Sequence, residues 1–234
     1  MWVVHLRSQP AGLEAVLSPD ERAQAHSLRT AALRRRFVLR RAARRHILGG
    51  YLGLPAHDVR FRRGVNGKPE PADRGLHVNC SHREELAVVA VCAAPLGVDV
   101  EYVGAGSGPE PAELDALARV MLSPAELAAY CALPAAGRRT ALLTVWTRKE
   151  AVVKALGVGL SLPLDSFDVP VEPTTPPRLL ARRGAARDGK LWSMVSLDLP
   201  AGYVGTVMAA GSRCRVHMRT WAPPTHFSPR RRRG

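Results

Sequence analysis

The chain has 234 residues, of which 34 are Lys or Arg and 20 are Asp or Glu, so that its formal net charge is +14. The hydrophobic fraction of 46% supports a sizeable core, but no apolar run reaches the roughly 18 residues that span a bilayer. Length and composition therefore argue against a membrane-spanning chain and allow one large or two small domains. The charge indicates an anionic partner, for which nucleic acid, an acidic protein and a polyphosphate cofactor are all candidates.

The cysteines and the first residues indicate in which cellular compartment the protein is expected. Four widely spaced cysteines without a C-x-x-C pair argue against a zinc ribbon or a disulfide framework and fit a reduced cytoplasm. The first five residues lack the basic region and long apolar stretch of a signal peptide. We therefore expect a cytoplasmic protein with no membrane partner.

The first long element is a helical stretch that opens at Ser18. Ser18 is a suitable N-cap, Pro19 takes the first helical position, and Glu21 completes a capping box. No Gly or Pro follows until Gly49. Residues 33–48 hold seven arginines, which are too many for one helix face, so several are expected to be solvated.

A hairpin and a strand come next. Asn66-Gly67 is typical of a tight hairpin turn, and taken alone it is a turn followed by the exposed Lys68. Residues 77–82 predict a strand that ends in Ser81-His82. Because neighbouring residues on a strand face opposite ways, these two are not expected to form a nucleophile–base pair.

Two later segments carry most of the chemistry. The apolar run 86–98 predicts a buried strand that ends in GVDVE, where Asp99 and Glu101 point the same way. Residues 146–154 predict a helix with Glu150 and Lys154 one turn apart on one face. Each pair alone could be a solvated surface pair. If the two faces meet, three carboxylates converge beside a lysine, which predicts a Mg²⁺ site suited to a substrate phosphate.

The order of elements recurs along the chain. Ser123 and Glu126 repeat the first capping box, and both helical stretches end in a glycine-rich segment followed by strand-like residues, although chance similarity of common caps is the alternative. An α+β fold is predicted, with two pseudo-symmetric halves, each a helix on a small antiparallel sheet, and the active site in the cleft between them. We place the halves at residues 1–104 and 105–227, joined by a linker at 104–109, with a disordered basic tail at 228–234.

Taken together, GVDVE and WTRKEAVVK (residues 146–154) resemble the 4′-phosphopantetheinyl transferases of the surfactin-synthetase-activator type. That family shows G-[V/I]-D-x-E and then W-x-x-K-E-A-x-x-K at a similar separation. Residues 79–82 are similar to its N-[L/I]-S-H segment, but Arg83-Glu84 stands where the family has a small residue and glycine. Residues 67–69 match its G-K-P. The resemblance runs in patches from about residue 17 to 160.

The resemblance implies Mg²⁺-dependent transfer of 4′-phosphopantetheine from coenzyme A to a serine of an acyl or peptidyl carrier protein, with release of 3′,5′-ADP. It implies that Asp99, Glu101 and Glu150 hold the metal and that Glu150 and Lys154 act in catalysis. Coenzyme A would be held by four residues: Arg45, Lys68, Ser81 and His82. The other arginines of residues 33–48 would meet the acidic surface of the carrier, and the pseudo-dimeric chain is expected to act as a monomer.

Two other interpretations stay open. The charge and the arginine-dense helix would suit a basic nucleic-acid-binding protein, whose binding would weaken steeply with salt. No stacking aromatics accompany the basic clusters, so we expect no nucleic-acid partner. A carrier-binding homologue that has lost catalysis is the second alternative, and Mg²⁺-dependent turnover would separate it from a working transferase.

Overall fold

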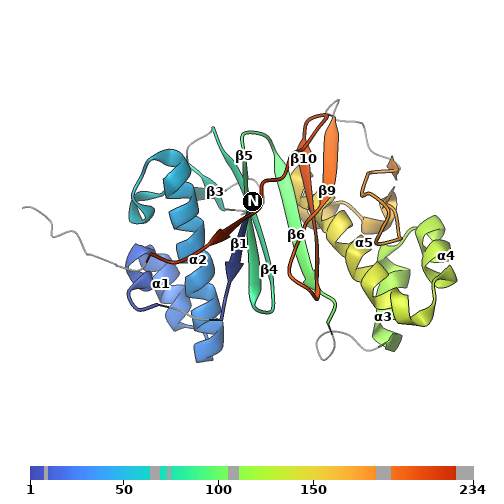
Figure 1. Ribbon diagram of the computed structural model, residues 1–234, viewed down its shortest axis with the longest axis horizontal. Helices are drawn as coiled ribbons and strands as arrows, with labels where there is room; N and C mark the ends of the chain where they lie inside the picture. The colour runs from blue at the N-terminus through green and yellow to red at the C-terminus, as the bar shows by residue number, and fades with distance from the viewer. Residues whose placement is uncertain (8–9, 64–68, 73–74, 105–110, 183–190, 225–234) are drawn as a thin grey trace, which may run out of the picture.

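The computed structural model describes the chain except for residues 8–9, 64–68, 73–74, 105–110, 183–190 and 225–234. Figure 1 shows four layers, in which helices cover the outer faces of two central sheets. The α-helices are α1 (Pro19–His26), α2 (Ala31–Leu52), α3 (Pro111–Met121), α4 (Pro124–Ala132) and α5 (Ala135–Leu156). No described helix is long and apolar enough to cross a membrane. The long helices α2 and α5 lie against opposite sheets, so the predicted α+β class is confirmed.

Two sheets form the centre of the molecule. The first has the order β11-β1-β5-β4, and the second has the order β6-β10-β9. Their strands are β1 (Trp2–His5), β4 (His77–Arg83), β5 (Leu86–Cys92), β6 (Leu96–Tyr102), β9 (Trp192–Ser196), β10 (Tyr203–Ala210) and β11 (Arg219–Trp221). Neighbours are antiparallel except for β1 and β11, which run parallel. Two small pairs complete the strands: β2 (Phe61–Arg63) with β3 (Pro69–Pro71), and β7 (Phe167–Asp168) with β8 (Ala181–Arg182).

The position of strand β5 between two cores explains why its sequence is apolar throughout. Alternate residues of a strand face opposite sides. Ala87 and Val89 join the core beneath α2, whereas Leu86, Val88 and Ala90 join a second core between the two sheets. Both faces are buried, so no polar alternation appears. A third core lies between α5 and the second sheet.

Two sequence predictions need correction. The apolar run 86–98 is two strands, β5 and β6, which turn at residues 93–95 and enter different sheets. The helical stretch after Ser18 is also divided: α1 ends at His26, and α2 begins after Thr30, whose side chain accepts a hydrogen bond from the Leu33 N–H. Residues 27–30 contain no Gly or Pro, so the break carries no strong sequence signal.

The repeated order of elements is present in the structure. Ser18 and Ser123 both form complete capping boxes, with Pro at the start of α1 and α4. Helices α2 and α5 have 22 residues each and end at Gly53 and Gly157, both in the left-handed conformation. Short 3-10 helices follow each glycine.

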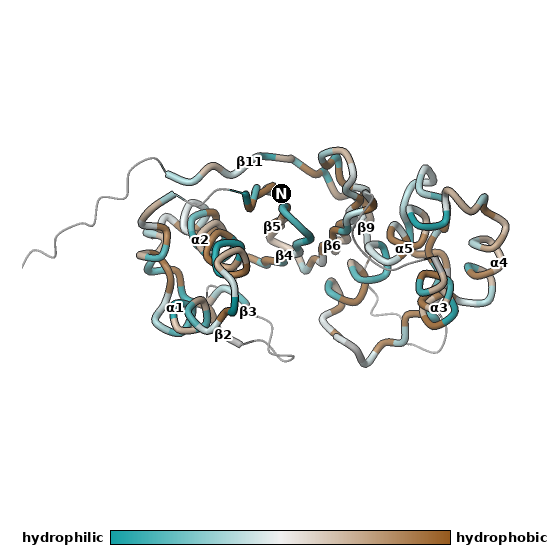
Figure 2. Tube along the Cα trace, turned by 90° about the horizontal axis from the view of Figure 1, so that it is seen from below, coloured by the Kyte–Doolittle hydropathy of each residue, from teal (hydrophilic) through white to brown (hydrophobic). Residues whose placement is uncertain are grey.

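Sheet membership does not follow the predicted division after residue 104. Strand β6 pairs with β10 in the second sheet, and β11 returns to pair with β1 in the first. Figure 2 shows this last segment crossing the molecule to the N-terminus, where the Met1 ammonium donates to the His217 carbonyl. The division at 104/105 stays a prediction, but the two sheets exchange strands across it.

Candidate active site

Strand β6 and helix α5 approach each other closely at Gly97. A Cβ atom at this position would overlap the carbonyl oxygen of Ala151 and the amide nitrogen of Ala155. Residues 96, 98 and 100 face the core between the sheets, so Gly97, Asp99 and Glu101 lie on the side of α5. The glycine of GVDVE therefore allows β6 to rest directly on the helix that carries Glu150 and Lys154.

Lys154 joins the two predicted motifs. Its Nζ lies 2.6 Å from Oδ1 of Asp99 and 3.8 Å from Oε2 of Glu150. Asp99 is only 4% exposed. Burial raises the pKa of Glu150 above its usual value, because it disfavours the charged carboxylate. The charge of Lys154 opposes this effect, and the charge of Asp99 adds to it. The strand face and the helix face do meet, and they bring a lysine between two carboxylates.

Glu101 belongs to the same cluster. Arg83 Nε lies 3.2 Å from its Oε2. Burial raises the pKa of Glu101, and the nearby charges of Asp99 and Glu150 add to that effect, while Arg83 and Lys154 oppose it. Three carboxylates and two cations thus lie within electrostatic range of one another.

The three carboxylates provide the oxygen atoms that Mg²⁺ prefers as ligands. Within the described part of the chain, no three Asp, Glu, His or Cys side chains stand close enough to hold a metal ion. However, Oδ2 of Asp99 is buried and has no hydrogen-bond partner among the described residues. An unpaired buried carboxylate oxygen beside two further carboxylates is the hard-oxygen environment that Mg²⁺ prefers. The residues fit the ion chemically, although Lys154 now takes the other oxygen of Asp99.

Ser81 and His82 point to opposite faces of β4. Ser81 Oγ donates to Asp99 Oδ1 at 2.7 Å, whereas His82 Nε2 lies 2.7 Å from Arg40 Nη1 on α2. The expectation that they do not form a nucleophile–base pair is confirmed. Desolvation of the ring, followed by the charges of Arg40, Lys154 and two further arginines, lowers the pKa of His82 to about 4.

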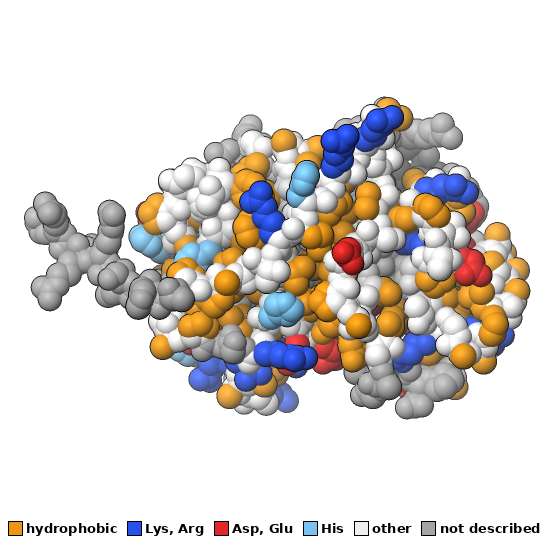
Figure 3. Space-filling view, in the orientation of Figure 1, with side chains coloured by type: hydrophobic (Ala, Val, Ile, Leu, Met, Phe, Trp, Pro, Cys, Tyr) orange, Lys and Arg blue, Asp and Glu red, His pale blue; other side chains and the backbone are white. Residues whose placement is uncertain are grey.

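A group of cations surrounds His82. It comprises three arginines of α2 and the lysine of α5: Arg36, Arg40, Arg41 and Lys154. Arg36 is itself paired with Glu85. Figure 3 shows basic and acidic side chains meeting near the lower ends of β4 and β6. A neutral imidazole among cations is suited to receive an anionic group.

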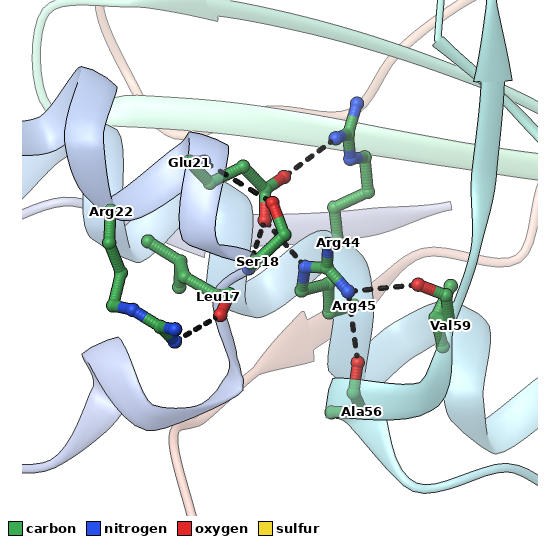
Figure 4. Close-up of polar contacts among 8 residues, drawn as sticks. All are labelled: Leu17, Ser18, Glu21, Arg22, Arg44, Arg45, Ala56 and Val59. Atoms are coloured by element: carbon green, nitrogen blue, oxygen red, sulfur yellow. Dashed lines mark hydrogen bonds and ion pairs between the residues drawn. The ribbon is translucent and has the colours of Figure 1, made fainter.

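Arg45 lies elsewhere, as Figure 4 shows. Its guanidinium is buried, donates to Glu21 at 2.6 Å and to the carbonyls of Ala56 and Val59 at 3.4 and 2.9 Å. Burial alone would raise the pKa of Glu21, but the Ser18 N–H and Arg45 lower it below its usual value. Arg45 therefore fastens α1 to α2, and its predicted contact with the nucleotide stays a prediction.

One expected cofactor residue cannot be placed, and the two cavities lie apart from this cluster. Lys68 is outside the described residues, as are most of the predicted linker and the basic tail. Cavities of about 200 and 310 Å³ lie near Met1 and Tyr51 and are lined by none of the predicted site residues.

Comparison with known proteins decides the family. Residues 95–207 match the family model described as the 4′-phosphopantetheinyl transferase superfamily. The chain is 34% identical to the 4′-phosphopantetheinyl transferase HetI of Nostoc sp., over 90% of this chain and 87% of the relative. It belongs to the 4′-phosphopantetheinyl transferase superfamily.

Other members of the superfamily match a shorter part of the chain. The chain is 32% identical to the 4′-phosphopantetheinyl transferase psf-1 of Bacillus pumilus, over 69% of this chain and 66% of the relative. It is 33% identical to a 4′-phosphopantetheinyl transferase of Bacillus subtilis, over 58% of this chain and 62% of the relative. It thus spans less than two thirds of these two relatives. The resemblance seen in the motifs is confirmed at the level of the family.

Two site features of this superfamily member went unnoticed in the sequence. Arg83 was noted only as a departure from the family pattern, although its place two residues after Ser81 puts both on one face of β4. The cation group on α2 could not be selected from seven candidate arginines, because these arginines are spread over several faces of the helix.

Proposed function

We propose that this enzyme transfers 4′-phosphopantetheine from coenzyme A to a serine hydroxyl of an acyl or peptidyl carrier protein and releases 3′,5′-ADP. The observation that carries the proposal is the contact of Lys154 with Asp99 and Glu150. All three residues lie inside the segment that matches the superfamily. The match to the superfamily alone would not say whether this chain retains its chemistry.

The reaction needs a base and a stabiliser of charge. The serine oxygen forms a bond to the phosphorus that carries the pantetheine arm, and the bond from that phosphorus to the oxygen of 3′,5′-ADP breaks. Glu150 accepts the serine proton, for which its raised pKa makes it a better base than an ordinary carboxylate. Lys154 donates a hydrogen bond to the oxygen of the leaving nucleotide, on which negative charge develops.

The carboxylates would hold a metal ion. Asp99, Glu101 and Glu150 would bind Mg²⁺, which when bound neutralises charge on the pyrophosphate. The unpaired Oδ2 of Asp99 supports this assignment. Before the ion binds, Lys154 and Arg83 compensate the negative charges of these side chains.

The nucleotide end would be held by cations. His82, together with Lys68 and the arginines of α2, would contact coenzyme A phosphates. Arg45 and Ser81 are also expected there, but in this structure Arg45 is engaged with Glu21 and Ser81 with Asp99. His82 and Arg40 are therefore the better candidates among the described residues.

The decisive experiment is intact-protein mass spectrometry of an apo carrier protein incubated with the enzyme, coenzyme A and Mg²⁺. We expect a mass gain of one phosphopantetheine, which EDTA abolishes. Glu150→Gln should lose the transfer, whereas Glu172→Gln, which removes an exposed carboxylate of the same half, should keep it. If carriers from several synthase classes show no gain in mass, this result would contradict the proposal and favour an inactive carrier-binding homologue. Salt-sensitive nucleic-acid binding would instead support the basic-binder alternative.

A further inference from the structure

Strands β4 and β6 run side by side but belong to different sheets. Side chains of β4 bridge the gap. Asn79 Oδ1 accepts from the Val98 N–H at 3.0 Å, and Ser81 Oγ accepts from the Val100 N–H at 3.3 Å. Arg83 then meets Glu101. Residues 79, 81 and 83 share one face of β4 by strand periodicity, so this face lies along β6 as a row of polar contacts.

The direction of the Ser81 hydroxyl proton follows from these contacts. The Val100 N–H can only donate, so Ser81 Oγ is its acceptor, and the single hydroxyl proton is directed to Asp99 Oδ1 at 2.7 Å. Ser81 and Lys154 together fix one oxygen of Asp99. The other oxygen, Oδ2, is buried and has no hydrogen-bond partner within the part of the chain that the structure describes. The serine therefore sets the orientation of the carboxylate and has no second proton for a phosphate.

Arg83 sets the orientation of the Glu101 carboxylate, as Ser81 does for Asp99. A carboxylate near Asp99 and Glu150 is repelled by both, so without a counter-charge it would turn away from them. The Arg83 guanidinium holds its Oε2 from the β4 side. The Arg83 side chain is 41% exposed while that of Glu101 is 16% exposed, so the arginine approaches from solvent and covers the carboxylate.

We infer that Ser81 and Arg83 are positioning residues, which hold Asp99 and Glu101 in the orientation that binds the divalent cation. The inference rests on the proposed function, since it assigns these carboxylates to the cation of that reaction. It gives Ser81 a role other than contact with coenzyme A, and it gives a role to Arg83, where this chain departs from the family motif. Outer residues that orient metal ligands typically change metal affinity by about 10–100-fold when they are replaced.

The test measures metal binding without turnover. Mn²⁺ serves as the probe, and the electron paramagnetic resonance signal of free Mn²⁺ is followed in the presence of coenzyme A. We expect Ser81→Ala and Arg83→Gln to weaken Mn²⁺ binding roughly tenfold. Ser81→Thr keeps the hydroxyl and Arg83→Lys keeps the charge, so both should restore most of the affinity. Arg119→Gln, which removes an exposed charge on α3, is the matched control and should bind as the wild type does.

The kinetics provide a second readout. At saturating Mg²⁺, the KM for coenzyme A should stay within about twofold of wild type in Ser81→Ala and Arg83→Gln, while the half-saturating Mg²⁺ concentration rises about tenfold. Unchanged Mn²⁺ binding in both variants would overturn the inference. Tighter Mn²⁺ binding in Arg83→Gln would also overturn it, because the arginine would then compete with the ion. A raised KM for coenzyme A in Ser81→Ala, with unchanged metal binding, would overturn it as well, because the serine would then be a phosphate ligand.

Failure of the inference and failure of the proposed function can be told apart. A wild-type enzyme that modifies a carrier while the variants bind Mn²⁺ normally keeps the function and refutes the positioning role. A wild-type chain that modifies no carrier but loses Mn²⁺ affinity on Arg83→Gln refutes the function and supports the positioning role. Because Arg83 is partly exposed, its replacement should leave the fold intact, which circular dichroism can verify.

Discussion

Lys149 and Arg148 are neighbours of Glu150 in sequence but point away from it into the interior. Lys149 Nζ lies 2.6 Å from Glu126 Oε2 and donates to the carbonyls of Leu164 and Phe167. Arg148 donates to four carbonyls of the loop at residues 170–175. Both side chains are fully buried. One turn of α5 thus presents the proposed catalytic groups on one side and, on the other, cations that organise the loop.

Replacing Lys149 by Met should cost about 3–5 kcal/mol in the free energy of unfolding. The buried Glu126 would lose its counter-charge while it still caps α4 and accepts from Val169 N–H. Urea denaturation provides the measurement. Adding Glu126→Gln to Lys149→Met should recover part of the loss, because no unpaired charge then remains. A loss below about 1 kcal/mol, typical of an exposed ion pair, would contradict a buried role.

His82 predicts a pH dependence of stability. The folded pKa of about 4 lies below the ordinary value of 6.5, so the folded protein binds fewer protons than the unfolded chain between these values. Its contribution is therefore complete above about pH 6.5 and is lost as the pH falls toward 4. Relative to His82→Gln, the wild type should lose about 1 kcal/mol of stability between pH 7.5 and 4.5. The loss is smaller than the full pKa shift implies, because solvent reaches the partly exposed ring and screens its charge. Parallel urea titrations of both proteins at the two pH values would test this, and equal losses would refute it.

At the scale of elements, the packing of β6 on α5 determines the site. The sequence motifs contain Gly97, Asp99, Glu150 and Lys154, and in the structure the other three meet where β6 passes α5 at the glycine. The backbone of β6 lies directly against the backbone of α5 and leaves no room for a side chain. Small displacements here would separate the two motifs.

Gly97→Ala should destabilise the fold by about 3 kcal/mol, at the upper end for overpacking, because the overlapping atoms are backbone. A shift of β6 by about 1 Å should also reduce transfer by roughly 100-fold. Gly137→Ala on α5 is the control, since its Cβ meets open space, and it should stabilise by about 0.5–1 kcal/mol. Thermal unfolding and the carrier mass assay give the two readouts. Wild-type stability and rate in the Gly97→Ala variant would show that the close approach is unnecessary.

The elements show where sequence reasoning succeeds and where it stops. Local signals predicted both capping boxes and the meeting of Asp99 with Lys154, because these depend on short spacings and strand or helix periodicity. The break at residues 27–30 was missed, because these residues contain no Gly or Pro and a single threonine cap is a weak signal. The environment of Arg45 depends on how α1 packs on α2, which no local spacing encodes.

At the scale of the whole molecule, the two sheets share one core. Strands from both sheets contribute Val3, Val88, Val98 and Val207 to it. Because β6 and β11 each pair with strands on the other side of the predicted boundary, the halves complete one another. Unfolding should therefore be a single cooperative transition.

A fragment of residues 1–104 should not fold alone. It would leave β6 without β10 and would lack β11 beside β1, exposing the apolar face of the core between the sheets. Circular dichroism and the dispersion of amide signals in a nuclear magnetic resonance spectrum would compare it with the full chain. A sharp, cooperative melting transition of the fragment would contradict the prediction and support an independent first half.

The pairing of β1 with β11 also sets an order of events during synthesis. Strand β1 is translated before the other described elements, but its parallel neighbour β11 emerges only after all of them have been made. Until then, one edge of the first sheet has open hydrogen-bonding groups, which invite pairing with other nascent chains. Among the described strands, the last to be translated thus pairs with the first. A ribosome that stalls before residue 219 would release a chain in which this edge of the sheet is unprotected.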